Sequence, residues 1–102
     1  YIVRLKSFQN QTFTIMSVII LSHDVQDFDA WKPYYYADAP RRENLGLKDL
    51  AVGNASDEPT KVYIIWEGDP AKVEQILQDP ELPGLMKEAG VVSAPEITVL
   101  NT

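Results

Sequence analysis

The stretch that decides the fold is Ser17-Val-Ile-Ile-Leu-Ser-His-Asp-Val25, followed by an aromatic-rich segment that begins at Phe28. The run of consecutive apolar residues in the first stretch is typical of a strand that is buried on both faces. Asp27 is a good N-cap, and apolar residues recur after it at helical spacing as far as Leu45. Gly46 is well placed to end this helix. The sequence therefore predicts a strand followed by a helix over Phe28–Leu45.

Proline residues divide the predicted helices. Pro33 and Pro40 both fall inside Phe28–Leu45. Because proline lacks the N–H that an interior helical position donates, we expect a kink or break near Pro40. The pair Asp79-Pro80 interrupts the second helical stretch in the same way.

The remaining elements complete a recognisable order. The predicted segments are a strand at 47–54, a strand at 61–67, a helix at 70–89 and a strand at 96–101. The resulting order, βαββαβ, predicts an α+β fold: a ferredoxin-like sandwich with an antiparallel sheet. The helices of such a unit cover one face of the sheet, whereas strand residues 17–25 and 62–66 are apolar on both faces. We therefore predict a homodimer in which a second copy covers the other face.

Composition excludes several classes of function. The 102 residues suit one domain, and 45% of them are hydrophobic, without any run long enough to span a membrane. The net charge of −6 argues against a nucleic-acid partner. The absence of cysteine excludes disulfides, thiolate catalysis and Cys-ligated metal, and the presence of only one histidine argues against a metal site, so we expect neither metal nor cofactor. The prediction is a cytoplasmic protein that binds a small organic ligand or another protein.

Residues 1–15 differ from the rest of the chain. They contain no acid and two bases, Arg4 and Lys6, and Met16 begins a clean strand. Two interpretations remain open: a leader or expression remnant ahead of a start at Met16, or a native arm rich in β-forming residues. In either case the sequence predicts an extension at 1–15 and a domain at 16–102.

Aromatic residues form the first candidate site. Trp31, Tyr34 and Tyr35 are close together on the first helix, and Trp66 lies on the sheet against which that helix packs. Tyrosine and tryptophan combine apolar rings with polar groups, which suits a pocket for a planar organic ligand. The alternative is an ordinary core between helix and sheet.

Charged and titratable residues form the second candidate. Arg42 lies near the aromatic stripe if the helix continues past Pro40, and Asp38 then lies four residues before it. This pair would either orient a ligand or form an ordinary exposed ion pair. His23 is either a catalytic acid or base or a structural residue at the end of a strand. Arg42 and His23 are thus the candidate catalytic residues.

The sequence resembles one known family. The segments that carry the resemblance are Phe28-Asp-Ala-Trp-Lys-Pro33, Ala39-Pro-Arg-Arg42 with Gly46, Leu82-Pro-Gly-Leu-Met-Lys-Glu-Ala-Gly-Val91 and Pro95-Glu-Ile97. They are similar to small dimeric α+β-barrel proteins of the antibiotic biosynthesis monooxygenase-like or cyclase-like group. The resemblance implies a protomer whose sheet packs on that of a partner to form a barrel, with a pocket between helices and sheet.

The resemblance also bears on activity. Similar proteins often carry His where this chain has Asp38, which weakens a mechanism based on a His–Arg pair. The haem-degrading branch uses an Asn, Trp and His set whose His has no counterpart on the second helix, so haem degradation is rejected. The resemblance implies a cofactor-independent monooxygenase or cyclase that acts on an aromatic polyketide-like substrate. Trp31 and Tyr35 would bind this substrate, and Arg42 would stabilise a developing enolate. The competing interpretation is a non-catalytic ligand-binding or stress-linked interaction module.

Overall fold

A computed structural model describes residues 16–101. In chain order its elements are β1 (Ser17–Asp24), α1 (Phe28–Ala37), α2 (Ala39–Asn44), β2 (Lys48–Ala55), β3 (Glu58–Gly68), α3 (Pro70–Leu77), α4 (Leu82–Glu88) and β4 (Glu96–Leu100). The extension proposed at 1–15 lies outside the described residues, so the division of the chain at Met16 stays a prediction.

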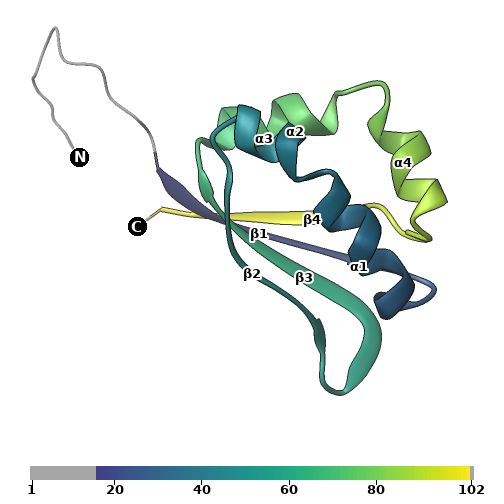
Figure 1. Cartoon of the computed structure of the whole chain (residues 1–102). Helices are drawn as coiled ribbons and strands as arrows, with labels where there is room; N and C mark the ends of the chain where they lie inside the picture. The colour runs from purple at the N-terminus through teal and green to yellow at the C-terminus, as the bar shows by residue number, and fades with distance from the viewer. Residues whose placement is uncertain (1–15, 102) are drawn as a thin grey trace, which may run out of the picture.

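The strands form one antiparallel sheet in the order β2-β3-β1-β4. The central strand β1 pairs with β3 on one side and with β4 on the other, so the two ends of the domain meet in the sheet. The helices lie together on one face of this sheet, as Figure 1 shows. The predicted α+β class and ferredoxin-like arrangement are confirmed.

The first predicted helix is two helices. α1 ends at Ala37, and α2 begins at Ala39, one residue before Pro40. Pro40 has no N–H to continue the hydrogen-bonding ladder of α1, so the chain starts a new helix there. The predicted break near Pro40 is confirmed, whereas a continuous helix to Leu45 is wrong. The interruption predicted at Asp79-Pro80 is also confirmed, because it separates α3 from α4.

The first turn of α1 forms because its backbone donors are capped. Asp27 precedes the helix in an extended conformation, and its Oδ1 accepts hydrogen bonds from the backbone N–H groups of Asp29 at 3.0 Å and Ala30 at 3.4 Å. These bonds satisfy donors that have no partner inside the helix. The cap fixes where α1 begins and therefore which of its residues face the sheet.

The two faces of the sheet differ in burial. Ile19 and Leu21 of β1, with Val62 and Ile64 of β3, face the helices and are almost fully buried. On the opposite face Tyr63 is 41% exposed and the neighbouring apolar side chains are only partly buried. The core therefore lies between the sheet and the helices, and the other face is open in a single chain.

Within residues 16–101, no helix has the length and apolar character needed to cross a membrane. The cytoplasmic location expected from the sequence stays a prediction.

Candidate functional site

A cavity of about 120 Å³ lies between the helices and the sheet. One wall comes from α1 and α2, the opposite wall from α3 and α4, and the floor from β1 and β3. The residues singled out in the sequence all line this cavity: His23, Trp31, Tyr34, Tyr35, Asp38, Arg42 and Trp66. The structure therefore brings them to one place, while their roles in binding or catalysis stay predictions.

An aromatic ladder builds the α1 wall. Phe28, Trp31 and Tyr35 follow the helical repeat, with ring centres 5.8 Å and 5.0 Å apart and the planes of each successive pair within 30° of parallel. The ring of His23 meets Trp31 edge-on at 5.6 Å. Tyr34, in contrast, is 47% exposed and lies at the rim. The ladder makes this wall flat, which suits contact with a planar molecule.

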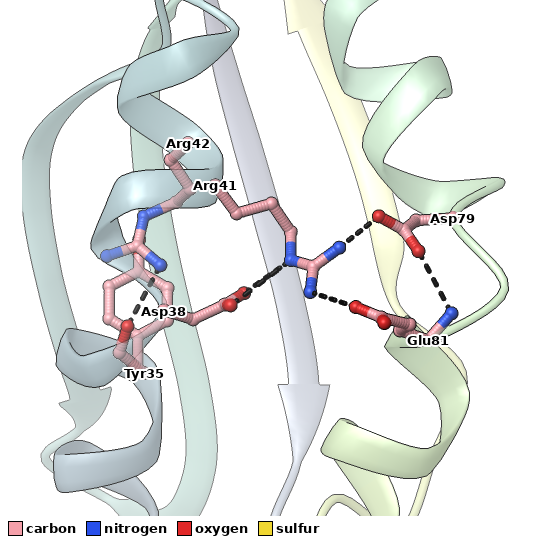
Figure 2. A network of polar contacts seen from close by, with 6 residues as sticks. All are labelled: Tyr35, Asp38, Arg41, Arg42, Asp79 and Glu81. Carbon is pink, nitrogen blue, oxygen red and sulfur yellow. Dashed lines mark hydrogen bonds and ion pairs between the residues drawn. The ribbon is translucent and has the colours of Figure 1, made fainter.

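Arg42 continues the ladder. Its guanidinium carbon lies 3.7 Å from the centre of the Tyr35 ring, and the residue is 3% exposed. Arg42 Nη1 donates to the backbone carbonyl of Tyr35 at 2.9 Å, as Figure 2 shows, and Nη2 donates to Asp49 Oδ2 at 3.4 Å. Arg42 is thus buried beside the aromatic ladder, with its charge balanced by a carboxylate from β2.

A chain of hydrogen bonds joins this ion pair to the sheet. The Tyr35 hydroxyl donates to Asp49 Oδ1 at 2.6 Å, and the Trp66 ring N–H donates to the Tyr35 hydroxyl oxygen at 2.8 Å. Burial and then the hydrogen bond to Asp49 raise the pKa of Tyr35 far above its ordinary value of 10.0. Tyr35 therefore stays protonated at physiological pH and positions its neighbours as a hydrogen-bond donor.

The predicted bond between Asp38 and Arg42 is wrong. Asp38 instead accepts from Nε of the adjacent Arg41, at 3.1 Å to each carboxylate oxygen, and Arg42 pairs with Asp49 (Figure 2). The prediction required one continuous helix, in which residues four apart share a face. The break between α1 and α2 changes that relation, because Asp38 caps the end of α1 while Arg42 belongs to the next helix.

His23 is buried among apolar groups on the cavity floor. It is 6% exposed, and its Nδ1 has no hydrogen-bond partner among the described residues. Desolvation lowers the pKa of His23 from its ordinary value of 6.5, against a smaller opposing influence from Asp24. The imidazole is therefore neutral at pH 7 and retains hydrogen-bonding capacity within a mostly apolar site.

The lowered pKa of His23 predicts how stability depends on pH. Below pH 6.5 the unfolded chain takes up a proton at His23 that the folded chain resists, so unfolding becomes easier as the pH falls. We expect the melting temperature to fall by a few degrees between pH 7.5 and pH 5.0. His23→Gln, which does not titrate, should reduce this fall. Equal pH profiles for the two proteins in thermal unfolding would contradict the assignment.

Several residues of the site were not identified from the sequence. Asp49, the partner of Arg42, lies on β2, and only the pairing of β2 with β3 brings it near α2. The wall made by Leu85, Met86 and Ala89 belongs to the helix predicted at 70–89, which the sequence did not identify as part of a cavity. Arg41 was quoted in a motif without a role, although its spacing from Asp38 also permits an ion pair.

Comparisons with known proteins extend the description of the fold. The sequence matches no family model and no curated protein. Among solved structures, a putative antibiotic biosynthesis monooxygenase from Caulobacter crescentus superposes with a TM-score of 0.64 at 11% identity, over 88% of this chain and 92% of that one. A NIPSNAP-like domain protein from Burkholderia xenovorans superposes with a TM-score of 0.62 at 11% identity, over 85% and 84% of the two chains.

A third structure agrees with these two. A putative antibiotic biosynthesis monooxygenase from Nitrosomonas europaea superposes with a TM-score of 0.54 at 10% identity, over 90% of this chain and 94% of that one. At such low identity these likenesses show the fold alone. They confirm the resemblance found in the sequence as a resemblance of fold.

Proposed function

We propose that this protein binds a small, uncharged, single-ring organic molecule in the cavity between its helices and sheet. The carrying observation is the cavity itself: about 120 Å³, with a flat aromatic wall formed by Trp31 and Tyr35. An apolar cavity of roughly 150 Å³ is sufficient to hold a benzene molecule. The volume therefore supports a ligand of about one ring.

The charges around the cavity support an uncharged ligand. Arg42 is the one buried cation among the described residues, and Asp49 already balances it. Asp38 lines the cavity as well and is paired with Arg41. An anionic ligand would lose its hydration without gaining an unpaired cation, which is unfavourable. The sequence predicted that Arg42 would orient a ligand, and its balanced pair with Asp49 supports a neutral molecule in that role.

Two polar atoms of the cavity residues support a ligand that carries one hydrogen-bonding group. His23 Nδ1 and Arg42 Nε are buried and have no partner among the described residues. Buried polar groups are normally satisfied, and an unsatisfied one costs free energy that a bound ligand recovers. A phenol, with one hydroxyl on one ring, fits both the volume and this polar requirement.

Binding can be measured with fluorinated probes in fluorine NMR. We expect 4-fluorophenol and fluorobenzene to bind with dissociation constants of roughly 0.1 to 1 mM, and 4-fluorobenzoate to bind far more weakly. Ala89→Leu should abolish binding, because Ala89 lines the cavity and the larger side chain fills it. Ala37→Leu makes the same change at an exposed position of α1 and should leave binding unchanged.

His23 provides a second comparison. The hydroxyl should give 4-fluorophenol a higher affinity than fluorobenzene, and His23→Leu should reduce this difference, since it removes one of the two unpaired polar atoms while the apolar walls remain. Preferential binding of 4-fluorobenzoate by the unmodified protein would overturn the proposed ligand class.

Catalysis is the second candidate function, because two of the proteins with a similar fold are putative antibiotic biosynthesis monooxygenases. In this proposal neutral His23 removes a proton from the bound ring, and the resulting carbanion reacts with molecular oxygen. One oxygen atom becomes a carbonyl at the former CH₂ carbon, and the other leaves as water. A polycyclic polyketide is larger than the cavity. We therefore prefer the binding of a single-ring molecule as the proposed function. Oxygen consumption in the presence of a bound substrate separates catalysis from binding alone.

We also propose that the protein acts as a homodimer. The face of the sheet away from the helices carries partly exposed apolar side chains from three adjoining strands: Val18, Ile20, Tyr63, Ile65 and Leu100. A contiguous apolar patch of this kind is typical of an interface. A second copy that presents the same face would cover it.

A further inference from the structure

The guanidinium of Arg41 joins the two pairs of helices. Its Nε donates to both oxygens of Asp38, its Nη1 pairs with Asp79, and its Nη2 donates to Glu81 Oε1 at 3.1 Å. Asp38 ends α1, whereas Asp79 and Glu81 lie on the link between α3 and α4, as Figure 2 shows. We call these four residues the Arg41 cluster.

The Arg41 cluster lies at the edge of the cavity. Asp38 lines the cavity, and Leu77 and Leu82, which flank the Asp79–Glu81 link, line it from the other side. Glu81 has a side chain that is 75% exposed, so the cluster extends from the cavity wall to solvent. Within residues 16–101, its ion pairs are the polar contacts that connect α1 and α2 with α3 and α4.

The cluster also coincides with the breaks in both helical stretches. Asp38 lies between α1 and α2, next to the break caused by Pro40, and Asp79 and Glu81 flank Pro80 between α3 and α4. Such short breaks between rigid elements are positions where backbone rotation is readily absorbed. The ion pairs therefore connect two places where the helices can move.

We propose that the Arg41 cluster is a gate that controls access to the cavity, opening when Arg41 releases Asp79 and Glu81. The gate acts on the ligand site of the proposed function and rests on it for its biological role. Ion pairs with an exposed partner contribute little net stability, and salt screens them. Breaking these ion pairs therefore costs little free energy, in contrast to removing the partner of Arg42, whose guanidinium is buried. Loss of Arg41 should favour the open state without unfolding the sheet.

The sequence supplies an internal probe of opening. Its two tryptophans, Trp31 and Trp66, both line the cavity and are 3% and 4% exposed. Acrylamide, a small neutral quencher, acts by contact with the indole ring, so it quenches both tryptophans more strongly when the cavity opens. Arg41→Gln should increase the quenching constant by about fivefold, the change in the open population expected from losing about 1 kcal/mol. Lys32→Gln removes the cation of another helical ion pair, with Asp29, and should leave quenching unchanged.

Salt and a second variant complete the test. In the unmodified protein, 0.5 M sodium chloride should increase quenching, because the screening length is then roughly 4 Å. Arg41→Gln should show no such dependence. The double variant Asp79→Asn with Glu81→Gln keeps Arg41 and the Asp79 oxygen that accepts from the Glu81 N–H, and should also raise quenching. Quenching that is unchanged in both variants at unchanged melting temperature would overturn the gate.

Ligand exchange separates the gate from the proposed function. Fluorine NMR of 4-fluorophenol should show faster exchange in Arg41→Gln than in the unmodified protein, with a smaller change in affinity. If the probe fails to bind while quenching still depends on Arg41, the proposed ligand is wrong and the gate stands. If the probe binds with equal exchange rates in both proteins, the gate is wrong and the proposed function stands.

Discussion

Asp49→Ala is expected to lower the free energy of unfolding by about 2 to 3 kcal/mol, a loss typical of breaking a partly buried ion pair. Arg42 is 3% exposed, and Asp49 is its carboxylate partner. Removing Asp49 leaves a buried guanidinium without a counter-charge and also removes the acceptor of the Tyr35 hydroxyl. Urea unfolding followed by tryptophan fluorescence measures this loss, because Trp31 and Trp66 are both buried.

Three further variants identify the cause of that loss. Asp57→Ala removes an exposed acid in the turn between β2 and β3 and should change stability by less than about 0.5 kcal/mol. Tyr35→Phe removes only the hydroxyl and should cost about 1 to 2 kcal/mol, since it leaves the Trp66 N–H without an acceptor. Adding Arg42→Met to Asp49→Ala should recover part of the stability, because no unpaired charge then remains. A double variant less stable than Asp49→Ala alone would contradict the charge argument.

Ile65→Lys is expected to convert a dimer to a monomer. Ile65 lies opposite Ile20 on the central strands, on the face of the sheet without helices. A lysine there would place an unpaired charge in the proposed interface and weaken association by about 100-fold or more. Light scattering after size exclusion should give the mass of two chains for the unmodified protein and of one chain for the variant.

Tyr36→Lys is the matched control for this experiment. Tyr36 is a large aromatic side chain that is 53% exposed on α1, on the helical side of the molecule. Introducing a lysine at this exposed position should leave the dimer intact. A stable monomer of the unmodified protein at micromolar concentration would rule out the proposed assembly, and equal masses for the two variants would place the interface elsewhere.

The two adjacent arginines, Arg41 and Arg42, differ in how their charges are held. Arg42, with Asp49 and the Tyr35 carbonyl, is held on both terminal nitrogens, and only its Nε remains without a partner. Arg41 makes comparable ion pairs, but one of its partners is largely exposed. The two adjacent arginines therefore differ in what their loss does: Arg42 stabilises the fold, and Arg41 is proposed to control access.

The sequence by itself determined the order of elements, the antiparallel α+β fold and both helix breaks. These features depend on local properties: apolar runs, the Asp27 cap and the geometry of Pro40 and Pro80, which act within a few residues. It also identified Trp31, Tyr35 and Trp66 as neighbours, because helical spacing and the packing of a helix on its sheet are regular.

Only the tertiary structure decided how the charges pair. Arg42 and Asp49 are seven residues apart, on different elements, and Arg41 pairs with Asp79 and Glu81, which lie on the link between α3 and α4. No periodicity relates these positions. Because the helix breaks before α2, residues of α1 and α2 do not share a face at regular spacing, and the position of β2 depends on strand pairing. The position of each ionic side chain thus depends on how whole elements pack, which spacing along the chain does not encode.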